Sequence, residues 1–179
     1  MTMEQSFEGG LSLGEPDTLD GGAAEARPRA APQGRISPGS DVLELWYRLL
    51  ARPWSCLVVV SPDETAATLR LARSLAELGT YYRRHPVEVI DGIRLDVERA
   101  AAIAHRLEPQ DGAPRRPEPR FVVALDSPIA NPIAFGVLAA GDTVLMLLEK
   151  GVTRIPDARR IAEVVGRERL AGAVLAVKP

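Results

Sequence analysis

Residues 55–79, SCLVVVSPDETAATLRLARSLAELG, constrain the fold of this chain more than any other stretch. The run 56–60 is continuously apolar and rich in valine, which is typical of a central strand that is covered on both faces in a parallel sheet. The apolar pattern that follows predicts an amphipathic helix over about 63–78, which Gly79 would end as a left-handed residue. A buried strand that turns directly into a helix is the first unit of an α/β fold.

The same alternation of strands and helices continues through the rest of the chain. Because such elements are joined by right-handed crossovers, the sequence predicts a doubly wound, mainly parallel sheet of about five strands flanked by helices. The further strands are predicted at 87–90, 121–125, 143–148 and 172–177, and the further helices at 41–52, 96–107, 132–139 and 156–165.

Apolar periodicity assigns inward faces to two of these helices. In the helix 41–52 the inward residues are Val42, Leu45, Trp46 and Leu49. Asp96 can cap the helix 96–107 by accepting a hydrogen bond from a first-turn amide. The predicted inward residues of this second helix are Val97, Ala100, Ala104 and Leu107.

Two segments show neither the strand period nor the helix period. Residues 1–39 are rich in Gly, Pro, Ala and Ser, a composition that predicts a disordered tail. Residues 108–119, EPQDGAPRRPEP, carry four prolines and predict a mobile loop. We therefore expect a single α/β domain over 40–179 with a tail in front of it.

Composition argues against several classes of function. The formal net charge of −2 lacks the excess of positive charge that is typical of nucleic-acid-binding proteins. The single cysteine, Cys56, lies inside an apolar run and is predicted to be a buried hydrophobe; with only two histidines in the chain, a metal cluster is not expected. No apolar run approaches the roughly 20 residues that span a bilayer, and MTMEQSFEGG lacks the features of a secretory signal. We expect a cytoplasmic protein without a direct membrane span, which would associate with a membrane through a partner.

The candidate site follows from the predicted sheet, since ligands of such sheets bind beyond the carboxyl ends of the strands. Ser61, Asp91, Asp126 and Glu149 stand at these ends, and three of the four are acidic. The turn after the first strand, SPDET, contains neither glycine nor lysine. A phosphate-binding loop needs glycines so that successive amides can converge on the anion, and a lysine to offset its charge.

The order of four segments resembles a known family. These are LARSLAELG, VEVIDGIRLD, RFVVALDSP and the long run AAGDTVLMLLEKGVTRIPDARRIAEVVGRERLAGAVLAV. Together they resemble the cytoplasmic ATPase domain of the bacterial tyrosine kinases of capsule and exopolysaccharide synthesis, which belong to the MinD/ParA-like class of P-loop proteins. The resemblance covers about residues 41–177 and implies a P-loop NTPase-like fold.

The resemblance also implies roles for individual residues. Asp91 matches the family's second acidic motif, and Asp126 matches the aspartate that helps to hold magnesium. Glu44 and Arg48 match the family's subunit-contact helix. The phosphate loop departs from the family, because Glu64 stands where the family has its phosphate lysine and Thr65 where it has its magnesium-binding Ser or Thr.

This departure predicts a remnant of a nucleotide pocket. Glu64 would place a carboxylate near the phosphates, and Pro62 removes an amide donor, so the loop should repel ATP. The remnant comprises Ser61, Glu64, Thr65, Asp91 and Asp126. We expect no catalytic residue and no metal there, with Asp126 and Asp91 as ligands only if magnesium binds.

Three functions follow from these observations. The first is a non-catalytic accessory or regulatory protein of polysaccharide biosynthesis or export, which needs no cofactor and binds other proteins, such as a membrane chain-length or co-polymerase subunit or a second copy of itself. The alternative is an active Mg-ATP-dependent ATPase or tyrosine autokinase with an atypical phosphate loop, in which Arg94, Arg154 or a partner supplies positive charge. The third is an unrelated doubly wound enzyme with Asp126 and Ser127 at its switch point.

Overall fold

Strands and helices alternate along the part of the chain that the computed structural model describes, residues 40–108 and 119–177. These residues belong to the unit Ile36–Pro179. The predicted tail 1–39 and nearly all of the predicted loop 108–119 lie outside the described residues. The elements are α1 (Ser40–Leu50), β1 (Cys56–Val60), α2 (Ala67–Arg83), β2 (Glu88–Gly92), α3 (Val97–Leu107), β3 (Phe121–Leu125), α4 (Ala134–Ala140), β4 (Thr143–Glu149), α5 (Ile155–Val165) and β5 (Leu170–Ala176).

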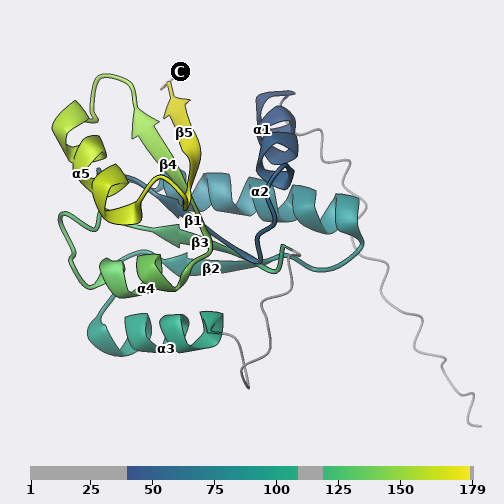
Figure 1. Cartoon of the computed structure of the whole chain (residues 1–179), viewed down its shortest axis with the longest axis horizontal. Helices are drawn as coiled ribbons and strands as arrows, with labels where there is room; N and C mark the ends of the chain where they lie inside the picture. The colour runs from purple at the N-terminus through teal and green to yellow at the C-terminus, as the bar shows by residue number, and fades with distance from the viewer. Residues whose placement is uncertain (1–39, 109–118, 178–179) are drawn as a thin grey trace, which may run out of the picture. The chain divides into compact units, whose positions relative to one another are not determined.

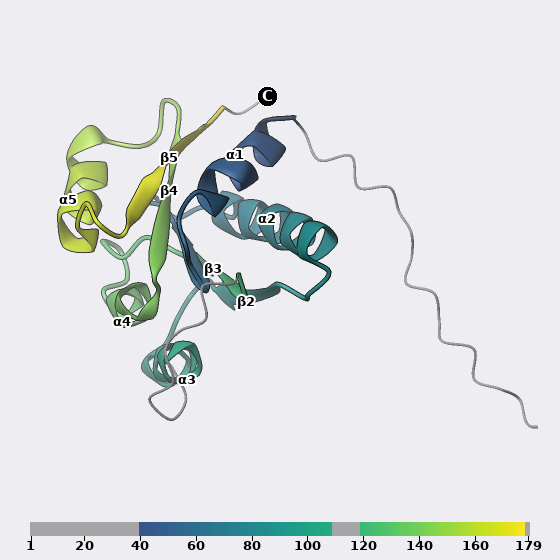
Figure 2. The same ribbon diagram turned by 45° about the vertical axis from the view of Figure 1, so that its right-hand side comes forward.

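The strands form one five-stranded sheet in the order β2-β3-β1-β4-β5, and every neighbouring pair is parallel. This confirms the predicted α/β class and the parallel sheet. Helices α1 and α2 cover one face of the sheet, and α3, α4 and α5 cover the other (Figures 1 and 2). Each strand therefore contributes alternate side chains to two apolar layers.

The central strand β1 is buried along its whole length, as its continuous apolar sequence predicts. Val58 and Val60 face the core beneath α3, α4 and α5. Leu57 and Val59 face the core beneath α1 and α2. Cys56 is also buried, in agreement with its prediction as a small hydrophobe.

The predicted end of α2 at Gly79 is wrong, because the helix continues to Arg83 and Arg84 takes the left-handed conformation instead (φ 58°). A close approach explains the glycine, since a Cβ at this position would lie 2.7 Å from both Trp46 Cη2 and Val87 Cγ2. The helix also begins later than predicted, at Ala67. Residues 61–66 are therefore a longer connection between β1 and α2 than the sequence pattern suggests.

The extension of α2 carries two tyrosines. Tyr81 and Tyr82 lie on the last turn of this helix. Tyr47 of α1 is exposed, and its ring centroid lies 5.9 Å from that of Tyr82. Desolvation raises the pKa of Tyr82 above its ordinary value, and its interaction with Tyr47 raises this pKa further.

Helix α3 begins as predicted, because the Asp96 side chain accepts a hydrogen bond of 2.7 Å from the Arg99 amide. The prediction that Val97 faces inward is wrong, since its side chain is 69% exposed. Ile103 takes part in the core instead. The buried residues of α3 are Ala100, Ile103 and Leu107, and Val97 lies at the margin of the stripe that they form.

Candidate functional site

The candidate site lies where the carboxyl ends of β1, β3 and β4 meet at one edge of the sheet. Because all strands are parallel, the segments that follow Val60, Leu125 and Glu149 leave the sheet at this same edge. The chain then turns in opposite directions, since α2 leaves β1 toward one face while α4 and α5 leave β3 and β4 toward the other. Such a reversal beside the central strand is the usual ligand-binding position in a doubly wound sheet.

The turn after β1 is held by its own hydroxyl groups. Ser61 is fully buried, and its Oγ accepts a hydrogen bond of 3.2 Å from the Asp63 amide. Thr65 Oγ1 accepts one of 3.1 Å from the Ala67 amide at the start of α2. Because these amides already have side-chain acceptors, they are not directed at an empty position in the way that the amides of a phosphate loop are.

Two pairs of side chains join this turn to the segment after β4. Thr65 Oγ1 donates a hydrogen bond to Glu149 Oε1, and Thr153 Oγ1 donates one to Asp63 Oδ2. Thr153 Oγ1 also accepts the Glu149 amide at 2.8 Å. Glu149 is only 9% exposed, so its carboxylate is held inside the protein. We call these four residues, Asp63, Thr65, Glu149 and Thr153, the edge clasp.

A third contact joins the same turn to the end of β3. Ser127 is 1% exposed, and its Oγ donates a hydrogen bond to the Pro62 carbonyl. The same oxygen accepts the Ala130 amide at 3.3 Å. Pro62 has no N–H group that could bind an anion, and its carbonyl already accepts the hydrogen bond from Ser127. The turn is thus bound to the segments that follow both neighbouring strands.

The two aspartates of the predicted remnant support the loop between β2 and α3. Asp126 Oδ2 accepts the Arg94 amide at 2.7 Å, and Asp91 Oδ1 accepts the Ile93 amide at 3.0 Å. Asp91 itself is exposed, whereas Asp126 is half-buried. Arg94 has a positive φ of 55°, a strained conformation for a residue with a side chain, and the Asp126 carboxylate helps to fix it there.

The structure brings together some of the predicted site residues and separates others. Ser61 and Thr65 share one turn, and Thr65 contacts Glu149, which the sequence placed at a strand end. Glu64, which the resemblance aligns with a phosphate-binding lysine, has an exposed side chain. The carboxylates held at the centre of this edge are therefore those of Asp63 and Glu149.

Sequence reasoning missed the roles of Asp63 and Thr153. Thr153 lies four residues after Glu149, and a hydroxyl at that distance can turn back onto the strand end. This four-residue spacing was the only signal in the sequence for the role of Thr153. The partners, however, are 84 and 90 residues apart in the chain for the Thr65–Glu149 and Asp63–Thr153 pairs. No local pattern identifies pairs at that distance.

Chemically, this edge presents carboxylates and hydroxyl groups that bind one another. A further anion would meet the charges of Asp63 and Glu149 and amides that already have acceptors. Within residues 40–108 and 119–177, no group of three or more His, Cys, Asp or Glu side chains is arranged to hold a metal ion. The arrangement is suited to fixing the loops rather than to cradling a phosphate.

We expect the edge clasp to contribute measurably to stability. The Thr65→Val variant keeps the shape of the side chain but removes the donor to the Glu149 carboxylate, which should lower the free energy of unfolding by about 1 to 2 kcal/mol. Urea titration followed by circular dichroism measures the change. Thr65→Ser retains the hydroxyl and should recover most of the loss. Equal losses for valine and serine would mean that the hydroxyl contributes nothing.

A double-mutant cycle tests the contact between Thr65 and Glu149 directly. In a double-mutant cycle of Thr65→Val with Glu149→Gln, the two losses should not add, and their coupling should be about 0.5 to 3 kcal/mol. Additive losses would show that the two side chains act independently.

Neither protein-family models nor curated proteins match this chain. Among the described residues, the structure contains no helix with the length and apolar character needed to cross a membrane.

Proposed function

We propose that this chain is a non-catalytic α/β protein that acts by binding other proteins, as an accessory or regulatory subunit of polysaccharide biosynthesis or export. The observation that carries the proposal is the edge clasp, in which Thr65 and Thr153 bind the carboxylates of Glu149 and Asp63. These contacts involve the turn after β1, the segment in which a P-loop protein would hold its phosphates. The sheet that would carry a nucleotide is present, but its edge is closed by the protein's own side chains.

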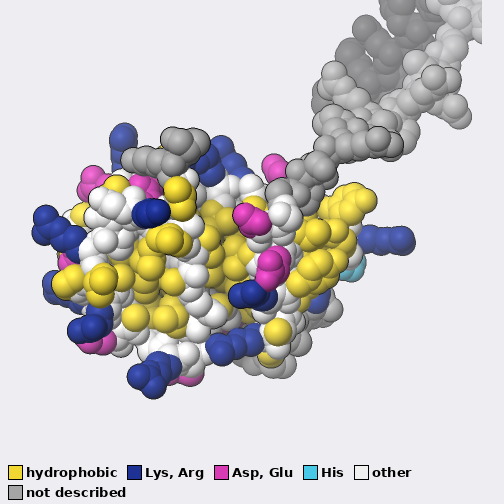
Figure 3. All heavy atoms as spheres, turned by 90° about the horizontal axis from the view of Figure 1, so that it is seen from above, with side chains coloured by type: hydrophobic (Ala, Val, Ile, Leu, Met, Phe, Trp, Pro, Cys, Tyr) yellow, Lys and Arg dark blue, Asp and Glu magenta, His cyan; other side chains and the backbone are white. Residues whose placement is uncertain are grey.

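Exposed apolar side chains on the described surface support a binding role. Figure 3 shows one face on which hydrophobic side chains form broad areas, with Lys and Arg side chains around them. Apolar areas with a polar rim are a feature of protein-binding surfaces. The large hydrophobic side chains with an exposed fraction above half are Tyr47, Tyr81, Val97, Ile155, Val164, Leu175 and Val177.

The resemblance to polysaccharide-synthesis kinases supplies the proposed setting. In this proposal the protein works in the cytoplasm and associates with the membrane through a chain-length or co-polymerase subunit, or pairs with a second copy of itself. It needs neither ATP nor magnesium for this work. The polysaccharide setting rests on the resemblance alone, whereas the loss of nucleotide binding rests on the geometry of the turn.

The direct test is isothermal titration of the full chain with Mg-ATP and with Mg-ADP. We expect no saturable binding tighter than about 1 mM, because two carboxylates and a closed turn oppose the phosphates. A control protein with an intact phosphate loop, titrated with the same nucleotide solutions, establishes that binding would be detected. Micromolar binding that is lost in the Asp126→Asn variant would overturn the proposal and favour the Mg-ATP-dependent ATPase or kinase.

A complementation assay in the native host also distinguishes the non-catalytic function from the Mg-ATP-dependent alternative. The amide oxygen introduced by Asp126→Asn can still accept the Arg94 amide, so the loop should keep its conformation, but the charge that magnesium requires is gone. A non-catalytic protein should restore polymer export fully in this form. Failure of a folded Asp126→Asn protein to restore export would support the catalytic alternative.

A further inference from the structure

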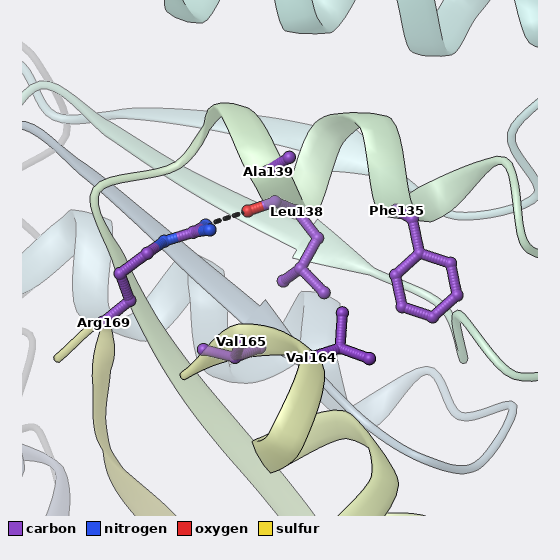
Figure 4. A pocket seen from close by; sticks show the side chains of 6 residues that line it. All are labelled: Phe135, Leu138, Ala139, Val164, Val165 and Arg169. Atoms are coloured by element: carbon purple, nitrogen blue, oxygen red, sulfur yellow. Dashed lines mark hydrogen bonds between the residues drawn. The ribbon is translucent and has the colours of Figure 1, made fainter. Parts of the chain in front are cut away.

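A cleft between α4 and α5 lies apart from the candidate site. It has a volume of about 370 Å³ and is lined by Phe135, Leu138, Ala139, Val164, Val165 and Arg169 (Figure 4). Leu138 and Ala139 stand near the end of α4, and Val164 and Val165 near the end of α5. Because these helices return from the carboxyl edge of the sheet, their ends lie toward its amino edge, opposite the edge clasp.

The walls of this cleft are apolar, with a single charged side chain. Figure 4 shows the guanidinium of Arg169 at one end and the ring of Phe135 at the other, with Leu138 and Val164 between them. Val164 is 56% exposed, so one wall of the cleft faces solvent. A molecule entering the cleft would meet hydrocarbon along its length and a cation at one end.

The Arg169 guanidinium has N–H donors without an acceptor and no acidic partner among the described residues. Its Nη2 donates to the Leu138 carbonyl and to the Gly141 carbonyl at 3.0 Å, which satisfies the last turn of α4. The ion pairs of the described part of the chain involve other residues. A guanidinium has five N–H donors, so within residues 40–108 and 119–177 those on Nε and Nη1 are left for another acceptor.

The carbonyls at the end of α4 offset only part of the positive charge. A helix terminus carries roughly half an elementary charge, and α4 is short. Arg169 is half-buried beside apolar side chains, where a cation interacts with an anion more strongly than it would in open water. Because both two-donor faces of the guanidinium use Nη2, which the two carbonyls already occupy, an anion in the cleft would accept a single charge-assisted hydrogen bond from Nε or Nη1.

We propose that this cleft binds a small monocarboxylate with an apolar body, such as a medium-chain fatty acid. The carboxylate lies on Arg169, and the apolar body runs along Leu138 and Val164 toward Phe135. The volume falls within the range of small-molecule sites, which combine apolar walls with few polar groups that fix orientation. A nucleotide or a sugar phosphate is a poor match, because its polar groups would lie against valine and leucine.

The test is titration of the full chain with octanoate, followed by two-dimensional ¹H–¹⁵N NMR. We expect saturable shifts confined to α4, α5 and the segment around Arg169. Octanol has the same chain without the charge, and acetate has the charge without the chain, so each should bind at least about tenfold more weakly. Octanol binding as tightly as octanoate, or shifts centred elsewhere, would overturn the assignment of Arg169 as the anchor.

Two variants test the cleft without removing the support that Arg169 gives to α4. Val164→Glu places a competing carboxylate in the cleft, and Ala139→Phe fills part of its volume, so each should weaken octanoate at least about tenfold. The matched control is Val152→Glu, which adds the same charge at an exposed valine outside the cleft. Its affinity should match wild type, and each variant's thermal unfolding shows whether it is folded.

Equal affinity of wild type, Val164→Glu and Ala139→Phe would overturn the proposal, as would the absence of saturable octanoate binding up to millimolar concentrations. The proposal does not depend on the proposed loss of nucleotide binding, since the edge clasp on which that loss rests lies at the opposite edge of the sheet. A protein that bound Mg-ATP could still bind octanoate in this cleft.

Discussion

Gly79→Ala is expected to destabilise the protein by about 2 to 3 kcal/mol, although glycine to alanine in a helix normally stabilises. Gly79 lies inside α2, and an added Cβ would approach Trp46 Cη2 and Val87 Cγ2 to 2.7 Å. Trp46 cannot move aside easily, because it is fully buried and its ring packs edge-on against Trp54 with centroids 5.9 Å apart. Chemical denaturation followed by tryptophan fluorescence measures the loss.

Gly136→Ala is the matched control for this substitution. Gly136 lies inside α4, and nothing in the described part of the chain is within 4 Å of the position its Cβ would take. The helix preference for alanine should then act alone and stabilise the protein by up to about 1 kcal/mol. Opposite signs for the two glycines are the expected result. If Gly79→Ala also stabilised the protein, the close packing of Trp46 against α2 would be wrong.

The fold was largely predictable from the sequence because its strongest signals are local. The apolar runs of β1 and β3 are located at the residues predicted, 56–60 and 121–125, since a strand buried on both faces has an unbroken hydrophobic sequence. The end of α2 was not predictable in the same way. Gly79 has the sequence signature of a helix end, but its actual role depends on Trp46, a residue from another helix.

The candidate site was predictable in position but not in its contacts. Parallel strands place Ser61, Asp126 and Glu149 at one edge, and the sequence identifies these strand ends. What the side chains do there depends on partners from distant parts of the chain. Thr65 and Glu149 contact across 84 residues, so their pairing follows from the register of β1 and β4 and not from any local spacing.

The two edges of the sheet differ in how they are held together, which bears on the proposed function. At the carboxyl edge, side-chain hydrogen bonds join the turn after β1 to the segment after β4, where doubly wound sheets commonly bind ligands. At the amino edge, Asp142, which precedes β4, accepts hydrogen bonds from the amides of Ser55 and Cys56 at the start of β1. In the proposed function, the hydrogen bonds at the carboxyl edge serve stability, and the protein-binding surfaces lie elsewhere.

Asp142→Ala is expected to lower the free energy of unfolding by about 3 kcal/mol, because it leaves buried donors at the start of β1 without their acceptor. Asp142 Oδ2 accepts the Ser55 amide at 2.8 Å, the Ser55 hydroxyl at 2.6 Å and the Cys56 amide at 2.9 Å. The Asp142 amide in turn donates to the Cys56 carbonyl at 3.1 Å, so the residue joins β4 to β1 in both directions.

Urea unfolding of Asp142→Ala and Asp142→Asn separates the roles of the acceptor and its charge. Asparagine keeps a carbonyl oxygen that can accept from Ser55 and Cys56, so its loss should be about half that of alanine or less, since neutral acceptors bind more weakly than charged ones. The amides of Ser55 and Cys56 should also lose protection from hydrogen exchange in the alanine variant. Unchanged protection together with wild-type stability would show that Asp142 does not hold the amino edge, and that the backbone ladder between β1 and β4 suffices alone.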